Sequence, residues 1–246
     1  GEVVLRCAPI AVALEDCELP RRCSRCLCML DDLDDAATCK ACGIARFCSK
    51  CAEEDATAED HEAECWGLAV LLGNTSRAIR DRLLAQSGID ASRGSAATRL
   101  AVRLLAVRAR HIRGLEPLPL IDPSADDPNS PPVAHDVWQD VEELDPLVDT
   151  DLGEILDKLP KKVAKEVQGG ANMAALLAPT MARCHRNEVL RLVLRIRNNS
   201  MALLPEGRVR EATGSSQSFS WQDLGTGLYP SGAMFNHSCA PNCLWF

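Results

Sequence analysis

The sequence predicts an α+β fold in which helix dominates by residue count, and three observations support this prediction. Apolar stretches near the two ends of the chain, at 2–14 and 243–246, have the pattern of strands. Closely spaced cysteines and a histidine occupy the region between Cys23 and Cys65. From Cys65 to about Ser200, apolar residues recur mostly at helical spacing. We therefore expect a small, mostly β core built from the two ends, with a cysteine-rich unit and a larger helical part between them.

The first segment, 1–19, is predicted to be an N-terminal strand segment. Pro9 should interrupt the strand or form a bulge, because proline has no amide hydrogen for the ladder. The chain starts directly in this apolar stretch and stops in another one, at 243–246. Chain ends seldom lie inside buried strands, so we expect the chain to be truncated at both ends.

Residues 20–66, called the finger below, contain eight residues spaced like the ligands of two zinc sites. A structural zinc ion takes four ligands in a tetrahedron, so eight ligands make two sites. The last pair lies at i, i+4 on one face of a helix that we expect to begin near Ala52. Spacing alone does not fix which pairs share an ion. The ligands form three Cys-x2-Cys pairs and one His-x3-Cys pair: Cys23 and Cys26, Cys39 and Cys42, Cys48 and Cys51, His61 and Cys65.

Disulfides and buried thiols are the alternatives to zinc. Disulfides need an oxidising compartment, and no charged-then-apolar signal segment opens the chain. Buried thiols would not fall into three such pairs. Reduced thiols with zinc predict a cytoplasmic or nuclear location. Cys28 is expected to be a spare thiol, and Cys7, Cys17 and Cys184 to be small buried residues.

Zinc is also expected to be needed for folding. The finger is short and poor in large apolar side chains, so it cannot bury enough surface to fold unaided. Metal binding would then supply most of its folding free energy.

Residues 67–200 are predicted to form a large helical insert. Around Leu100, apolar residues at helical spacing lie opposite a row of arginines, which predicts an amphipathic surface helix. Six prolines near 114–136 predict an exposed linker rich in acidic residues. Helical patterning resumes around 137–167, is expected to break at Gly169-Gly170, and continues to about Ile196. The arginines of the first helix are Arg99, Arg103, Arg110 and Arg113.

The last segment, 201–246, combines a loop-like stretch with a polar motif. Residues 205–227 are rich in glycine and serine. The motif that follows is Asn236-His237-Ser238-Cys239-Ala240-Pro241-Asn242-Cys243. By its chemistry alone it is a polar turn after an apolar strand, in which Asn236 and His237 offer donors and acceptors to a polar ligand.

Composition and charge narrow the classes of partner. The chain has 246 residues, of which 46% are hydrophobic and 25% charged, as is ordinary for a globular protein. It has no run of eighteen apolar residues, so we expect no membrane span. The net charge of −8 and the acidic finger argue against a nucleic-acid partner, because neutralising phosphates needs clustered lysine and arginine.

The spacing of the finger resembles the MYND-type zinc finger. The resemblance rests on the eight zinc-ligand candidates and on Phe47-Cys48-Ser49-Lys50-Cys51, where the third pair has one intervening residue fewer than is usual in that family. MYND fingers are cross-braced. The resemblance therefore implies that Cys23, Cys26, Cys48 and Cys51 share one ion, and that Cys39, Cys42, His61 and Cys65 share the other.

The whole chain is similar to the SET-and-MYND family of protein-lysine methyltransferases. The motif at 236–243 resembles the NHSCxPN core of the SET domain, and 197–203 is similar to that family's Asn-Ser-Phe-x-Ile strand. The implied fold is a partial, mostly β SET core with an inserted two-zinc finger and a large helical insert. The implied activity is transfer of methyl from S-adenosylmethionine to a lysine of a protein substrate, histone or non-histone.

The same resemblance assigns cofactor contacts but no catalytic residue. In the family, the positions of Asn199, Asn236 and His237 line the S-adenosylmethionine site. The family's Gly-x-Gly cofactor loop is missing here, and the only tyrosine, Tyr229, precedes the 236–243 motif rather than following it. We therefore expect this chain to be an incomplete version with little or no activity. The alternative is a protein-interaction module without catalysis, whose finger binds a Pro-rich peptide.

Overall fold

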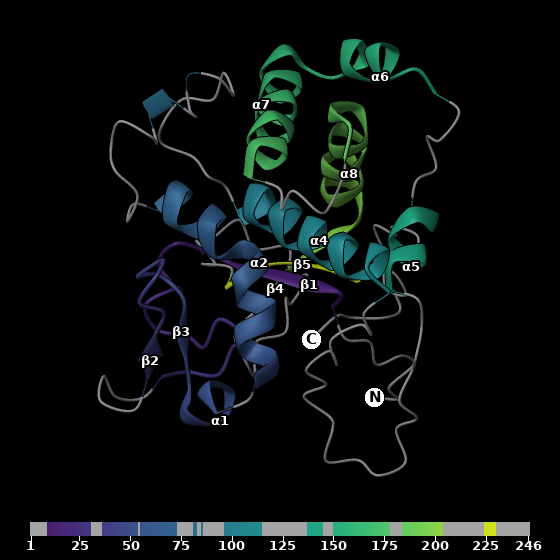
Figure 1. Ribbon diagram of the computed structural model, residues 1–246. Coiled ribbons are helices and arrows are strands. Elements are labelled where there is room, and N and C mark those ends of the chain that lie inside the picture. Colours follow the sequence, from purple (N-terminus) through teal and green to yellow (C-terminus); the bar gives the residue numbers. More distant parts are fainter. Residues whose placement is uncertain are drawn as a thin grey trace, which may run out of the picture.

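The computed structural model of the chain describes residues 9–30, 36–53, 55–72, 81–82, 85, 96–114, 137–144, 150–177, 184–203 and 224–229. In these ranges the protein is rich in helix and contains two small antiparallel sheets (Figure 1). The prediction that helix dominates an α+β fold is therefore confirmed at this coarse level. The helices are α1 (Ser49–Ala52), α2 (Asp55–Leu72), α4 (Ala96–Ile112), α5 (Val137–Glu143), α6 (Leu152–Lys158), α7 (Lys161–Leu177) and α8 (Arg186–Asn199).

The larger sheet joins segments from opposite ends of the chain. Its order is β1 (Ala11–Leu14), β5 (Gly225–Leu228) and β4 (Ser200–Leu203), with β5 central and antiparallel to both neighbours. The loop prediction for 205–227 is therefore wrong at its C-terminal end. Gly225 explains the tight pairing, because a Cβ atom there would lie only 2.2 Å from the Ala13 carbonyl oxygen. The strand predicted at 243–246 lies outside the described residues.

Helix α4 is the centre of the helical part and packs against β1, α2, α7 and α8 (Figure 1). The prediction of a surface helix is wrong, because residues on several sides of α4 are buried. Arg99 is only 5% exposed. Its guanidinium donates to the Leu14 carbonyl oxygen at 2.6 Å and pairs with Asp16 at 2.7 Å. Arg99 therefore binds the end of β1 and the turn after it, where a surface face was expected.

Helix α7 runs without a break through Gly169-Gly170, so the predicted interruption is also wrong. Both glycines are buried. A Cβ atom on Gly170 would meet the Thr98 hydroxyl oxygen of α4 at 3.4 Å, so the small residue lets α7 lie close to α4. The burial gained from this contact outweighs the low helix propensity of glycine. None of the helices in the described ranges is both long and apolar enough to cross a membrane.

Replacing Gly225 by Ala should destabilise the protein by about 1–3 kcal/mol, because the added methyl group must push β5 away from the main chain of β1. Gly170→Ala is the matched control. Its methyl group meets ordinary contact distances and raises helix propensity, so its stability should stay close to that of the wild type. Urea unfolding of both variants measures the difference. Equal stability of the two variants would contradict the packing described for Gly225.

Candidate metal centre

The finger is built from short elements that bring distant cysteines together. Strands β2 (Ala37–Thr38) and β3 (Arg46–Phe47) form an antiparallel hairpin in which Ala37 pairs with Phe47. Cys39 and Cys48 directly follow these two strands. Helix α1 then carries Cys51, and one face of α2 carries the i, i+4 pair His61 and Cys65. The hairpin therefore delivers one ligand to each of two clusters.

The eight ligand candidates lie in two groups of four. In each group the Cys Sγ and His nitrogen atoms all lie within 4.8 Å of one another. This is the grouping that the cross-braced resemblance implied. The ligand pairs of the two groups alternate along the chain. The groups are Cys23, Cys26, Cys48 and Cys51, called the all-cysteine cluster, and Cys39, Cys42, His61 and Cys65, called the histidine-containing cluster.

The distances within the clusters fit tetrahedral zinc. With zinc–sulfur bonds of about 2.3 Å, two sulfur atoms of one tetrahedron lie about 3.8 Å apart. The Cys26 and Cys48 sulfurs are 3.7 Å apart, and the Cys39 and Cys65 sulfurs 3.8 Å. A sulfur and an imidazole nitrogen should lie about 3.6 Å apart, and Cys42 Sγ lies 3.4 Å from His61 Nε2. The two sulfur atoms of a disulfide would instead lie about 2.05 Å apart.

Two similar turns position the first two Cys-x2-Cys pairs. After Cys26 and after Cys42 the chain enters the left-handed region, at Leu27 with φ 63° and at Gly43 with φ 68°. The amides of Leu27 and Gly43 each donate to the carbonyl of the first cysteine of their pair, at 2.9 and 2.8 Å. Past the second turn, the amides of the next two residues, 44 and 45, donate to Cys42 Sγ at 3.4 Å each. Such donors stabilise a thiolate over a thiol.

His61 is oriented for metal binding by a buried carboxylate. Its Nε2 faces the histidine-containing cluster, while its Nδ1 lies 3.5 Å from Glu64 Oε1. Glu64 therefore favours a proton on Nδ1, which leaves the Nε2 lone pair for a metal. Burial lowers the pKa of His61, but the hydrogen bond to Glu64 and its charge outweigh burial and raise it. The Phe47 ring packs edge-on against the imidazole, with centroids 5.5 Å apart.

Glu64 is in turn held by Arg103 of α4. Two parallel bonds join them, from Arg103 Nε to Oε2 at 2.7 Å and from Nη2 to Oε1 at 2.6 Å. Burial raises the pKa of Glu64, but the charge of Arg103 and the hydrogen bonds with His61 and Arg103 together outweigh burial, and the pKa falls to about 2. Arg103 also donates to the Val12 carbonyl of β1 and, at 3.3 Å, to the Ser24 carbonyl of the finger. One guanidinium thus connects the metal cluster, the finger backbone, α4 and the β sheet.

The thiols of each cluster cannot all ionise without a cation. The hydrogen bond with Cys26 lowers the pKa of Cys23 to about 4, whereas burial raises the pKa of Cys51 to about 12. Burial opposes ionisation of Cys39, but hydrogen bonds outweigh it and lower that pKa to about 6, while burial raises the pKa of Cys65 to about 12. A divalent cation would offset the repulsion between neighbouring thiolates in each cluster. The donor sets, four thiolates and three thiolates with one imidazole, are those of structural zinc.

The residues that support the clusters were not found in the sequence. Glu64 had a weak signal, since it lies three residues after His61 on the same helix. Arg103 had none, because its distance along the chain from the finger gave no reason to connect them. Among the other cysteines, Cys17 is exposed, so its prediction as buried is wrong, whereas Cys184 packs partly buried against the core. Cys7 lies outside the described residues.

The predicted cofactor residues are only partly described. Asn199 ends α8 beside β4, and its Nδ2 donates to the carbonyls of Arg195 at 2.9 Å and Leu144 at 3.4 Å. Asn236 and His237 lie outside the described residues. The structure therefore places Asn199 at the junction of α8, α5 and the sheet.

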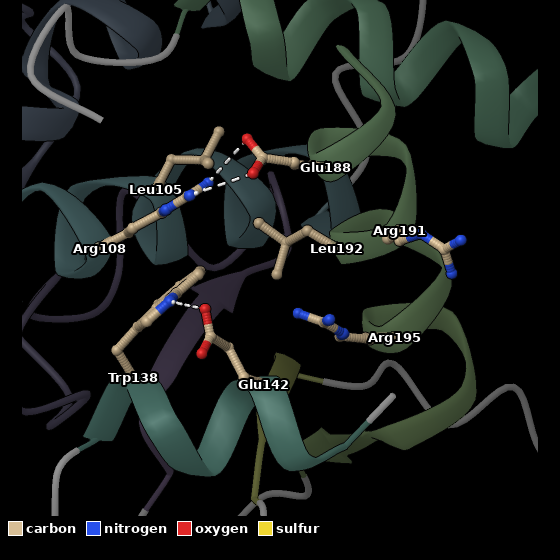
Figure 2. Close-up of a pocket in the computed structure, with 8 residues that line it drawn as sticks. All are labelled: Leu105, Arg108, Trp138, Glu142, Glu188, Arg191, Leu192 and Arg195. Atoms are coloured by element: carbon tan, nitrogen blue, oxygen red, sulfur yellow. Dashed lines mark hydrogen bonds and ion pairs between the residues drawn. The ribbon is translucent and has the colours of Figure 1, made fainter. Parts of the chain in front are cut away.

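A pocket of about 220 Å³ lies between α4, α5 and α8 (Figure 2). Arg108 crosses it to Glu188 at 3.3 Å and lies 5.5 Å from the centre of the Trp138 ring. The Trp138 indole donates to Glu142 at 2.8 Å. Arg195 extends into the space beside Glu142, whereas Arg191 points away from it (Figure 2). The contacts of Arg108 therefore connect α4 to α5 and to α8.

No protein-family model matches the chain, and a comparison with curated proteins found no match. The class of this protein is therefore argued from its fold and its two clusters alone. It is a helix-rich protein whose two cysteine-rich clusters could bind two zinc ions.

Replacing Cys39 by Ser or His61 by Ala should remove at least one of the two zinc ions and unfold the finger, because metal binding supplies the folding energy of such a small unit. Cys17→Ser is the matched control, since Cys17 is exposed and outside both clusters. Elemental analysis counts the zinc ions per chain, and circular dichroism measures the loss of folded structure. Two zinc ions and an unchanged spectrum in either variant would contradict the assignment of the histidine-containing cluster.

Replacing Arg103 by Met should lower the free energy of unfolding by about 3–5 kcal/mol, because Glu64 is left buried without its cation. Loss of the support for His61 should also weaken zinc binding by about 10–100-fold. Denaturant unfolding and competition with a zinc chelator measure the two effects.

Arg113→Met, which changes an exposed arginine just after α4, serves as the control for Arg103→Met and should behave like the wild type. Adding Glu64→Gln to Arg103→Met should restore part of the stability, since the unpaired charge is removed. A double variant no more stable than Arg103→Met alone would show that the buried Glu64 charge is not the cause.

Proposed function

We propose that this chain is a zinc-binding protein in which two structural zinc ions hold a cross-braced finger against a helical unit. The observation that carries the proposal is the gathering of eight thiol and imidazole donors into two tetrahedral-sized groups. Both clusters offer four protein ligands, which leaves no coordination position for a substrate or water. Closed sites of this kind serve structure, and catalytic zinc keeps an open position.

We further propose that the finger is of the MYND type and that the parent protein is a SET-and-MYND methyltransferase. Three features support this. The alternating use of the ligand pairs is the cross-brace of that finger, and the strand β4 follows Asn199 as the similarity to an Asn-Ser-Phe-x-Ile strand implies. Strand β5 also joins the first and last parts of the chain into one sheet, as expected for a β core interrupted by insertions.

The proposed reaction is transfer of a methyl group from S-adenosylmethionine to the amine of a protein lysine. Such an enzyme must deprotonate the lysine ammonium group and place its nitrogen in line with the methyl carbon and the sulfur. It therefore works by positioning and electrostatics. The proposed contacts to the cofactor are Asn199, Asn236 and His237. Histones and other lysine-rich proteins are the proposed substrates, and cytoplasm or nucleus is the proposed compartment.

A second candidate function is protein interaction through the finger. The side chains of Met29 and Trp66 are 49% and 51% exposed, although both are large and apolar. Trp66 directly follows the zinc-ligand candidate Cys65, so a metal-ordered finger would present it to a partner rigidly. A proline-rich peptide is the proposed partner, because its rings stack on exposed indoles at low entropic cost.

Isothermal titration of S-adenosylmethionine into the zinc-loaded chain tests the two functions, with zinc counted on the same sample. Measurable binding, weakened in an Asn199→Ala variant, would support the methyltransferase. Two zinc ions with no cofactor binding, but with retention of a proline-rich peptide that Trp66→Ala abolishes, would support the interaction module instead. A chain that holds no zinc would contradict both.

A further inference from the structure

A fifth sulfur lies at the surface of the all-cysteine cluster. Cys28 is not one of the four ligand candidates, and its thiol is exposed. Its Sγ nevertheless lies 3.3 Å from Cys26 Sγ. This is shorter than the 3.7 Å between Cys26 and Cys48, which belong to the cluster. Tetrahedral coordination leaves Cys28 without a role in metal binding, although it touches one of the ligands.

The backbone holds Cys28 in this place. Leu27, between the two cysteines, is left-handed with φ 63°, a conformation that costs a residue other than glycine about 1–2 kcal/mol. Extended backbone would separate the two Cα atoms by about 7 Å, at the limit of what a disulfide can bridge. The turn is fixed by the bond from the Leu27 amide to the Cys23 carbonyl, at 2.9 Å, and by that from the Cys23 amide to the Cys28 carbonyl, at 3.0 Å.

We infer that Cys26 and Cys28 form a reversible disulfide that releases zinc from the all-cysteine cluster under oxidation, an inference that rests on the proposed zinc binding. The oxidant is a peroxide. One of the two sulfurs takes an oxygen from hydrogen peroxide to become a sulfenic acid, and one water is released. The other sulfur displaces the hydroxyl group as a second water, and the S–S bond forms. Two thiols and one peroxide thus give one disulfide and two waters.

The disulfide changes the donor set of only one cluster. Cys26 loses the thiolate that a zinc ion requires, and Cys23, Cys48 and Cys51 remain as three donors, one fewer than a structural site uses. The histidine-containing cluster has no comparable extra thiol among the described residues. A dithiol reductant reverses the S–S bond by exchange and restores the site. The finger would therefore respond to an oxidant through the all-cysteine cluster.

Oxidation of the zinc-loaded chain with limiting hydrogen peroxide tests this inference. Released zinc is followed with a chromogenic chelator, and the protein is then digested. Cleavage after Arg25 and after Met29 yields a fragment of residues 26–29 that contains both thiols and no other cysteine. We expect loss of one zinc ion per chain, loss of two hydrogens from this fragment, and recovery of both after adding dithiothreitol and zinc.

Two variants make the test specific. Cys28→Ser should bind two zinc ions and keep both at peroxide concentrations that remove one from the wild type. Cys17→Ser, which removes another exposed thiol, should respond like the wild type. Equal zinc release from Cys28→Ser, or release while fragment 26–29 stays reduced, would overturn the switch. A chain without zinc before oxidation would instead contradict the proposed zinc binding, and the state of fragment 26–29 would still decide whether the thiols pair.

Discussion

The ion pair between Arg103, which is partly exposed, and the buried Glu64 is the interaction on which the arrangement of the molecule depends. It is the point where the histidine-containing cluster, the finger backbone, α4 and β1 meet. A carboxylate and a guanidinium lose their hydration when buried, so such a pair is stable only when further hydrogen bonds satisfy the remaining groups. Here His61, Val12 and Ser24 supply them. The pair therefore fixes the position of the finger on the helical unit more than it adds stability.

The two clusters place a second constraint on the finger. Their ligands alternate along the chain, and the strands β2 and β3 are each followed directly by a ligand of a different cluster, Cys39 and Cys48. Without a cation, burial and then the charges of neighbouring thiolates raise the pKa values of Cys51 and Cys65. Hydrogen bonds lower the pKa values of Cys23 and Cys39. Metal binding would couple to folding of the finger, since its buried apolar core is small and includes three of the cysteines, Cys23, Cys42 and Cys51.

The β sheet and α4 explain how segments far apart in sequence form one unit. Strand β5 separates β1 from β4, and β1 packs on the side of α4. Close approach requires a glycine at Gly225, where a Cβ atom would lie 2.2 Å from the Ala13 carbonyl oxygen of β1. Arg99 and Arg103 then donate to the carbonyl groups of Leu14 and Val12, which satisfies polar backbone groups of β1, the outer strand of this sheet in the described residues. The finger and the helices therefore share one rigid support.

The sequence alone determined the chemistry of the finger and the dominance of helix. Ligand spacing is local, so the eight candidates could be chosen from the sequence, and the structure gathers them into two groups of four that could hold a metal ion. Apolar periodicity indicated the main helices. Only the tertiary structure decided that α4 is central and that α7 continues through Gly169-Gly170. The same is true of Gly225 in a central strand and of Arg103 reaching Glu64 in the finger. Each of these depends on contacts between residues distant in sequence, and such burial and close packing leave no pattern in the local sequence.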